Sequence, residues 1–230
     1  MSGRLSVVVP VLNEAARIVQ HLTRLVHMPG VDEVIVADGG SADATADLAR
    51  SVDGVRVVIG RRGRGPQMNE GACAASGDVL WFVHADAGVP DAGPALIAAA
   101  LEDPAVVGGA FRIRTVTEGA GGWPASLLWL ADIRSRYSRL PYGDQAIFVR
   151  RDVFERVGRF APVPLFEDLD FSRRLHRRGR VRVLPAEVNV SGRRFLARPL
   201  SSAVLMNVLP LLYRLGVPPV QLARLYGHVR

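Results

Sequence analysis

The sequence contains no lysine and only one cysteine, and these two absences exclude several kinds of site. Without lysine, the chain cannot form a Schiff base with a substrate. It also cannot carry the phosphate-binding loop that ends in Gly-Lys-Ser or Gly-Lys-Thr. With Cys73 alone, an intrachain disulfide and a zinc site built on cysteines are both excluded. This cysteine usage agrees with a reducing, cytoplasmic setting.

Long apolar runs are also missing. The early apolar stretch at 6–12 is short, contains Pro10 and runs into Asn13, so it does not resemble a signal-peptide core. Residues 200–213 are mostly apolar, but Asn207 and Pro210 interrupt them. This stretch falls below the ~18 apolar residues of a membrane-spanning helix. We expect it to dock on the protein or to make a peripheral contact with the inner face of the membrane.

Acidic side chains are in the minority, with 22 Asp and Glu against 29 arginines and a formal net charge of +7. One explanation is a compositional bias of the genome. The other is an anionic partner, such as a nucleotide, an acidic lipid surface or a nucleic acid, because guanidinium groups bind phosphates well. The aromatic stacking platforms of nucleic-acid binders are lacking, so we expect no nucleic-acid partner.

The first half alternates short β-rich runs with helical patterns. The pattern predicts strands at 5–9, 33–37, 55–59 and 79–83, and helices at 13–27, 43–50, 68–75 and 91–101, the last capped by Asp91. Continuous apolar strands that alternate with helices are typical of a parallel sheet covered on both faces. The sequence therefore predicts an α/β fold whose ligands sit at the carboxyl ends of the strands.

The second half has a different character. It predicts strands at 106–113, 146–149, 181–184 and 188–190, and helices at 127–137 and 166–178. Gly108-Gly109 indicates a bulge or a close backbone approach within the first of these strands. A break near Asp103-Pro104 divides the chain into 1–103 and 104–195. We expect residues 196–230 to form a helical tail.

Acidic side chains follow three of the predicted parallel strands, which places Glu14, Asp38 and Asp86 at one edge of the sheet. Such carboxylates, together with substrate phosphates, are typical ligands of Mg²⁺ or Mn²⁺. Asp38 has the alternative role of accepting hydrogen bonds from a base or ribose. His84 is a metal neighbour, a phosphate donor or a packed histidine. Helix caps are the alternative for Asn13, Ser41 and Asp43.

Two further segments contain candidate residues. The basic, glycine-rich loop at 60–69 is suited either to wrapping phosphates or to lying solvated at the surface. In the second half, Glu167, Asp168 and Asp170 begin a predicted helix. These are more acidic residues than are needed to cap a helix or to complement its dipole. Asp168 is a candidate general base, and Glu167 is the alternative. Arg193 and Arg194 follow the last strand and are placed to clamp a diphosphate.

Several segments of the sequence, taken in chain order, resemble those of glycosyltransferase family 2, whose members have the GT-A fold. The matching segments are VVVPVLNE at 7–14, VADGGSADAT at 36–45, GRGPQMNEGA at 63–72, HAD at 84–86, the arginine pair at 150–151, Glu167-Asp168 and RRF at 193–195. YGDQAIFVRR at 142–151 and LYRLGVPP at 212–219 are similar to a subgroup associated with arsenosugar biosynthesis or selenodomains. Two departures from the family pattern are His84, in place of the first D-x-D acid, and Phe195, in place of the clamp tryptophan.

The resemblance implies an inverting transfer of a sugar from a nucleotide-diphosphate sugar, expected to be a UDP-sugar, to a small-molecule or lipid-linked hydroxyl. It implies that 1–103 binds the nucleotide-sugar and that 104–195 holds the acceptor and the catalytic group. It implies Asp168 as the base and Asp86 and His84 at the metal, Mg²⁺ or Mn²⁺. It assigns the donor to Pro10, Asn13, Glu14, Asp38, Arg64 and Asp86, and the other substrate contacts to Asp144, Gln145, Glu167, Arg193 and Arg194. The alternatives are a nucleotidyltransferase, which would normally use a lysine, and a non-enzymatic anion or nucleic-acid binder.

Overall fold

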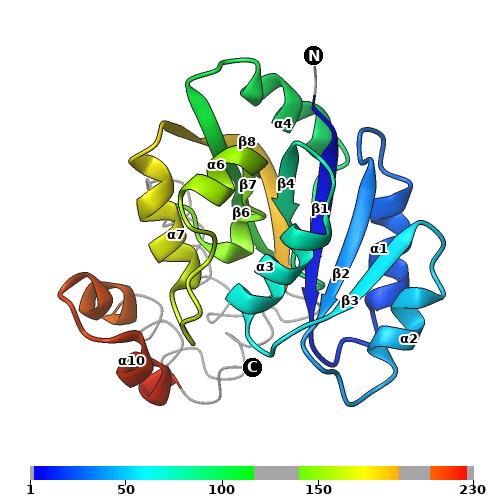
Figure 1. Cartoon of the computed structure of the whole chain (residues 1–230), viewed down its shortest axis with the longest axis horizontal. Coiled ribbons are helices and arrows are strands. Elements are labelled where there is room, and N and C mark those ends of the chain that lie inside the picture. Colours follow the sequence, from blue (N-terminus) through cyan, green and yellow to red (C-terminus); the bar gives the residue numbers. More distant parts are fainter. Residues whose placement is uncertain (1–2, 117–139, 192–207, 227–230) are drawn as a thin grey trace.

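The computed structural model describes residues 3–116, 140–191 and 208–226. The first two ranges form one eight-stranded sheet (Figure 1). The strand order is β3-β2-β1-β4-β7-β6-β8-β5. The strands are β1 (Leu5–Val11), β2 (Glu33–Asp38), β3 (Val55–Ile59), β4 (Val79–Phe82), β5 (Ala87–Gly88), β6 (Val106–Val116), β7 (Phe148–Arg150) and β8 (Arg180–Ser191). The helices are α1 (Ile18–Val26), α2 (Thr45–Arg50), α3 (Arg64–Ala74), α4 (Gly93–Leu101), η1 (Gly143–Gln145), α6 (Arg151–Arg156), α7 (Glu167–His176) and α10 (Pro219–Tyr226).

β1 to β4 are parallel, as the sequence predicts. In the register of the sheet, Val11 of β1 lies beside Asp38 of β2, and Val8 lies beside Phe82 of β4. The carboxyl ends of these strands therefore meet at one edge, and the loops that follow them are neighbours. β7 joins antiparallel to β4, so one sheet runs through both halves of the chain.

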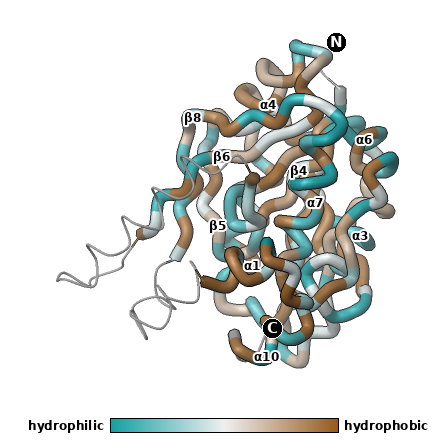
Figure 2. The backbone as a smooth tube through the Cα atoms, turned by 90° about the vertical axis from the view of Figure 1, so that its left-hand side faces the viewer, coloured by the Kyte–Doolittle hydropathy of each residue, from teal (hydrophilic) through white to brown (hydrophobic). Residues whose placement is uncertain are grey.

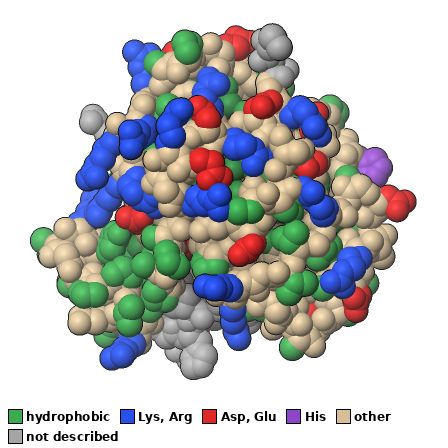
Figure 3. Space-filling view, viewed as in Figure 1, with side chains coloured by type: hydrophobic (Ala, Val, Ile, Leu, Met, Phe, Trp, Pro, Cys, Tyr) green, Lys and Arg blue, Asp and Glu red, His purple; other side chains and the backbone are tan. Residues whose placement is uncertain are grey.

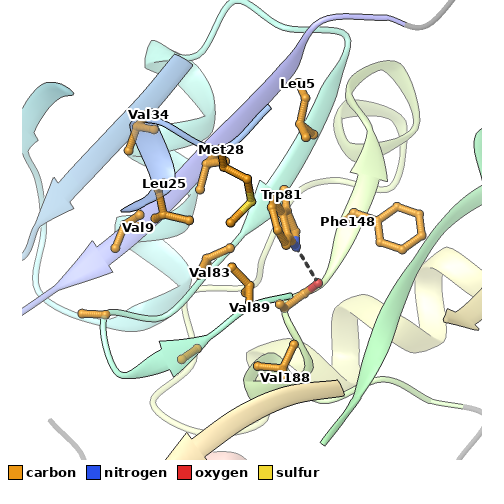
Figure 4. Close-up of a cluster of buried hydrophobic side chains, with 14 of the residues drawn as sticks. Leu5, Val9, Leu25, Met28, Val34, Trp81, Val83, Val89, Phe148 and Val188 are labelled. Carbon is orange, nitrogen blue, oxygen red and sulfur yellow. Dashed lines mark hydrogen bonds between the residues drawn. The ribbon is translucent and has the colours of Figure 1, made fainter. Parts of the chain in front are cut away.

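Alternate side chains of the sheet enter two separate cores. Val7 and Val9 face a core closed by α1, α2 and α4, whereas Val8 faces a core closed by α3, α6 and α7. In the first core, Trp81 is fully buried and its indole N–H donates to the carbonyl of Ala146 at 3.1 Å (Figure 4). This bond ties β4 to the turn that precedes β7. Coloured by hydropathy, the tube shows brown segments running through the interior of the body (Figure 2).

Three local expectations from the sequence are wrong. Residues 13–17 are a loop, and α1 begins only at Ile18. Asp91 does not cap α4, because its carboxylate forms an ion pair with Arg24 at 2.7 Å. The two short strands expected at 181–184 and 188–190 are one strand, β8, because an irregularity between them moves the register and keeps the pairing with β6.

Other expectations have a different outcome. The predicted bulge at Gly108 coincides with a register shift in β6. The predicted helix at 127–137 lies outside the described residues. No helix among those described is long and apolar enough to span a membrane.

Candidate active site

The loops after β1 and β2 are locked together by side-chain hydrogen bonds. The backbone N–H of Asn13 donates to the Ser41 hydroxyl at 2.9 Å, and that of Glu14 donates to the Thr45 hydroxyl at 2.8 Å. Asp43 accepts from the N–H of Thr45 at 3.0 Å. Neither α1 nor α2 has a side-chain cap. The polar residues that the sequence offers as caps therefore hold two loops in one position at the edge of the sheet.

Asp38 is buried at the end of β2, and only one of its two carboxylate oxygens accepts hydrogen bonds from the described residues. Its Oδ1 accepts hydrogen bonds from the N–H groups of Gly40 and Ser41, both at 2.7 Å. Its Oδ2 is buried and has no hydrogen-bond partner among the described residues. A buried oxygen without a partner carries a desolvation cost, which a hydrogen-bond donor on a ligand would relieve.

Gln67 of α3 fixes the position of Asp38, although the sequence analysis did not single it out. Its side-chain amide donates to the carbonyls of Val11 at 2.6 Å and Ala37 at 3.0 Å, at the ends of β1 and β2. A Cβ on Gly39 would lie 2.9 Å from this amide, so a larger residue there would displace the Gln67 side chain. In the sequence, Gln67 falls in the glycine-rich loop at 60–69, just before the predicted helix, so no signal there indicates that it is buried within α3.

His84 and Asp168 approach the same point from opposite parts of the chain. A Cβ placed on Gly143 would lie 3.2 Å from Oδ2 of Asp168 and 3.3 Å from Nε2 of His84. Oδ2 also accepts the N–H of Gly143 at 2.6 Å, and Oδ1 accepts the N–H of Leu169 at 2.7 Å. Gly143 thus allows the carboxylate of Asp168, on α7, and the imidazole of His84, after β4, to come together.

Glu167, beside Asp168, is buried in a different environment. Its Oε1 lies 3.9 Å from the guanidinium of Arg64, which is half exposed at the start of α3. Burial raises the pKa of Glu167 to about 7, and the neighbouring charge of Asp168 adds to this, while Arg64 opposes it. Asp170 points to another partner, Arg174, at 2.7 Å. The acids that open α7 therefore have separate surroundings.

The start of α7 is shaped by an unusual residue. Phe166 has a left-handed backbone (φ 66°), which a bulky residue rarely adopts, and it directly precedes Glu167. Its ring stacks on Tyr213 with centroids 5.0 Å apart. Packing against the C-terminal segment therefore supports the conformation that presents the two carboxylates.

The turn before β7 contains two predicted substrate residues. Gln145 is fully buried, and its amide oxygen accepts the N–H of Tyr142 while its nitrogen donates to the carbonyl of Phe111, both at 2.8 Å. It therefore holds the turn that carries Gly143. Asp144 is half-buried in η1. Arg193 and Arg194 lie outside the described residues.

Asp86 is exposed after β4, and it lies near an imidazole on α1. Burial lowers the pKa of His21 to about 4, and the charge of Asp86 opposes this. No group of three or more metal-binding side chains is found in the part of the chain that the structure describes. The exposed carboxylate of Asp86 is nevertheless of the kind that suits Mg²⁺ or Mn²⁺, which are usually held by one or two carboxylates together with substrate phosphates and water.

Comparisons with known proteins place this chain in a family. The sequence model described as glycosyl transferase family 2 matches residues 6–162, which is more than half of the chain. The chain belongs to glycosyl transferase family 2. The matched residues include β1 to β4, η1 and β7. A search of curated proteins found no match.

Several solved structures share the fold. A mannosyltransferase from Pyrobaculum calidifontis, in complex with GDP-Man and Mn²⁺, has a TM-score of 0.67 at 20% identity over 95% of this chain and 66% of its own. S. aureus TarS, with UDP-GlcNAc, has 0.62 at 20% identity over 82% and 58%. Glucosyl-3-phosphoglycerate synthase from Mycobacterium tuberculosis, with Mn²⁺, UDP and glucosyl-3-phosphoglycerate, has 0.58 at 22% over 94% and 81%. The chain spans just under two thirds of the first of these. They establish the mixed α/β GT-A fold.

Proposed function

We propose that this family 2 glycosyltransferase moves a sugar from a UDP-sugar to a hydroxyl acceptor with inversion at the anomeric carbon. The observation that carries the proposal is the open, buried Oδ2 of Asp38 at the same edge of the sheet as the fixed carboxylate of Asp168. Oδ2 of Asp38 is suited to accept a hydrogen bond from an N–H or O–H of a base or ribose. The carboxylate of Asp168 is suited to accept a proton.

The donor would lie over the ends of β1 and β2. Pro10, Asn13 and Glu14 line the β1 end, and Asp38 would bind the nucleoside. Arg64 at the start of α3 would meet the diphosphate, since helix starts and arginines both favour phosphate. Asp86 and His84 would hold Mg²⁺ or Mn²⁺. When bound, such an ion would neutralise the charge of the leaving diphosphate.

Asp168 is proposed as the general base. It would take the proton of the acceptor hydroxyl as that oxygen bonds to the anomeric carbon, while the bond from this carbon to the diphosphate oxygen breaks on the opposite face. Two backbone N–H groups hold its carboxylate in place, which favours this role over mobile acids. Glu167, the alternative base, is engaged with Arg64. Asp144, Arg193 and Arg194 remain proposed substrate contacts, and Gln145 would act by holding the turn.

The similar solved structures support a nucleotide-sugar as the donor, whereas the choice of UDP and of the acceptor is part of the proposal. The compared structures contain a GDP-sugar in one case and UDP or a UDP-sugar in others, two of them with Mn²⁺. The arsenosugar or selenodomain subgroup stays a prediction from the sequence, as do a small-molecule or lipid-linked acceptor and a cytoplasmic location.

Calorimetric titration with UDP tests the donor side. We expect UDP to bind in Mn²⁺ or Mg²⁺ and to lose most of its affinity in EDTA, and we expect Asp86→Asn to remove this metal dependence. Asp38→Asn should weaken UDP binding in either condition. Asp47→Asn is a matched control, because Asp47 is exposed on α2 and pairs with Arg50.

Equal UDP affinity in EDTA would remove the metal from the proposal. A mass-spectrometric screen of nucleotide-sugars identifies the donor. If the protein instead joins a nucleoside triphosphate to a sugar phosphate, it is a nucleotidyltransferase and the proposal is wrong.

A further inference from the structure

The last described segment, residues 208–226, forms a C-terminal hairpin with a defined turn. Residues 208–214 are helical, and Gly216 ends this helix in the left-handed conformation (φ 95°). Val217 N–H donates to the carbonyl of Leu212 at 3.0 Å, and Gly216 N–H donates to that of Tyr213 at 3.1 Å, the pattern of a Schellman motif. α10 then begins at Pro219, a residue suited to the first turn of a helix.

The inner side of the C-terminal hairpin is seated on the candidate active site. Leu209 and Leu222 are buried in a small cluster with Tyr142, Phe166 and Leu169. These partners come from the turn before Gly143 and from the start of α7, which together hold Asp168. The hairpin is therefore anchored on its inner face next to the catalytic side of the site.

The outer side of the C-terminal hairpin is also apolar. Among the described residues, eight large hydrophobic side chains are exposed, and five of them lie here: Val208, Leu211, Leu215, Val220 and Leu225. Leu215 is 74% exposed and Leu225 is 63% exposed. Figure 1 places the hairpin at a corner of the molecule, and Figure 3 shows hydrophobic side chains gathered at that corner with arginine side chains nearby. A gathered patch of this kind marks a contact surface.

The charged side chains on the hairpin itself are of one sign. Arg214 and Arg224 are both exposed on the hairpin. No Asp or Glu follows Glu187 in the sequence, whereas six arginines do. Leucines flanked by arginines, without acids, complement an anionic lipid surface, where the guanidinium groups reach phosphates and the leucines enter the acyl boundary.

We propose that the C-terminal hairpin binds the surface of an anionic lipid bilayer and places the candidate active site beside lipid-linked hydroxyl acceptors. α10 has eight residues, about 12 Å in length, against about 30 Å of hydrocarbon, so the contact lies along the surface. The choice of acceptor rests on the proposed glycosyltransferase function, whereas the lipid binding does not.

Sedimentation of the full chain with vesicles tests the proposal. The probes are vesicles of phosphatidylcholine alone and vesicles in which one quarter is phosphatidylglycerol, each at low and high salt. We expect binding to the anionic vesicles that weakens with salt. The triple variant Leu211→Gln, Leu215→Gln, Leu225→Gln should lower partitioning roughly tenfold or more, because burial of a single leucine can supply about that factor. Arg214→Gln should cost roughly fivefold.

Ile59→Gln is the matched control, because Ile59 is 58% exposed and lies on β3, away from the hairpin. It should bind vesicles as the unsubstituted chain does. Circular dichroism melts and UDP titration of each variant show that the variants fold.

Absent binding, equal binding to neutral vesicles, or equal binding by the triple variant would overturn the proposal. Dimerisation lost in the triple variant, without vesicle binding, would assign the patch to a second copy and would also overturn it. A chain that binds vesicles but no nucleotide-sugar would refute the proposed function and leave the lipid surface standing. The reverse result would refute only the lipid surface.

Discussion

Replacing Glu167 with glutamine should stabilise the protein at neutral and alkaline pH. The carboxyl group is buried beside Asp168, and its pKa is raised from 4.5 to about 7. In the unfolded chain, Glu167 ionises near pH 4.5, whereas in the folded chain it keeps its proton until about pH 7. The unfolded state therefore binds fewer protons between these values, and the free energy of unfolding falls as pH rises through this window.

The size of the effect follows from the pKa difference. A shift of this size corresponds to about 3 kcal/mol, because one pKa unit is worth about 1.4 kcal/mol. Glutamine has the shape of the protonated side chain and no charge. Glu167→Gln should thus match the unsubstituted chain near pH 4.5 and exceed its stability by up to about 3 kcal/mol at pH 8. For a chain of this length, that is roughly 6–12 °C in Tm.

Urea unfolding followed by circular dichroism at several pH values measures this difference. The control is Glu102→Gln, since Glu102 is exposed at the end of α4 and its replacement should change little at any pH. A stability difference for Glu167→Gln that is the same at pH 4.5 and pH 8, or that favours the glutamate at pH 8, would refute the reasoning. It would show that Arg64 holds the carboxylate ionised.

Two further predictions concern catalysis and the sheet edge. Asp168→Asn should lower kcat by roughly 10²–10⁴ with UDP affinity little changed, as expected for loss of a general base; steady-state kinetics that keep near-normal kcat in a folded variant would move the role to Glu167. Gln67→Leu removes one donor each from the carbonyls of Val11 and Ala37, although Val11 keeps the N–H of Gly39, and should cost about 1–3 kcal/mol of unfolding free energy. Urea unfolding measures this cost, and we expect weaker UDP binding with it. Full UDP affinity in this variant would show that Asp38 holds its position without the amide.

The first half of the fold could be predicted from the sequence, because β1, β2 and β4 are buried on both faces and the strands are separated by clear turns. The apolar runs at β1, β2 and β4 carry this signal directly. The second half was harder to predict. β8 was expected as two strands, since the polar and proline-containing stretch between its halves hides a continuous pairing with β6. The two-residue strand β5 is too short for any periodicity.

The site was predictable to the level of residue types and not of their contacts. The order of the acidic blocks indicates which carboxylates stand at the sheet edge. It cannot show that Gly143 brings His84 and Asp168 to one point, because that depends on contacts between distant segments. Nor can it show that Gln67, inside α3, ties the ends of two strands. Ser41 was expected as a candidate helix cap, but its hydroxyl accepts the N–H of Asn13 from the neighbouring loop. This contact cannot be predicted without the position of that loop.

The pairing of β4 with β7 has a consequence for how the chain folds during synthesis. β1 to β4 are complete once residue 82 has been made, but the strand that covers the free side of β4 arrives only at residues 148–150. Until then β4 presents an open edge, which is a template for wrong pairing with other chains. The nascent protein should therefore be most prone to aggregation, and most dependent on chaperones, during the interval between these two strands.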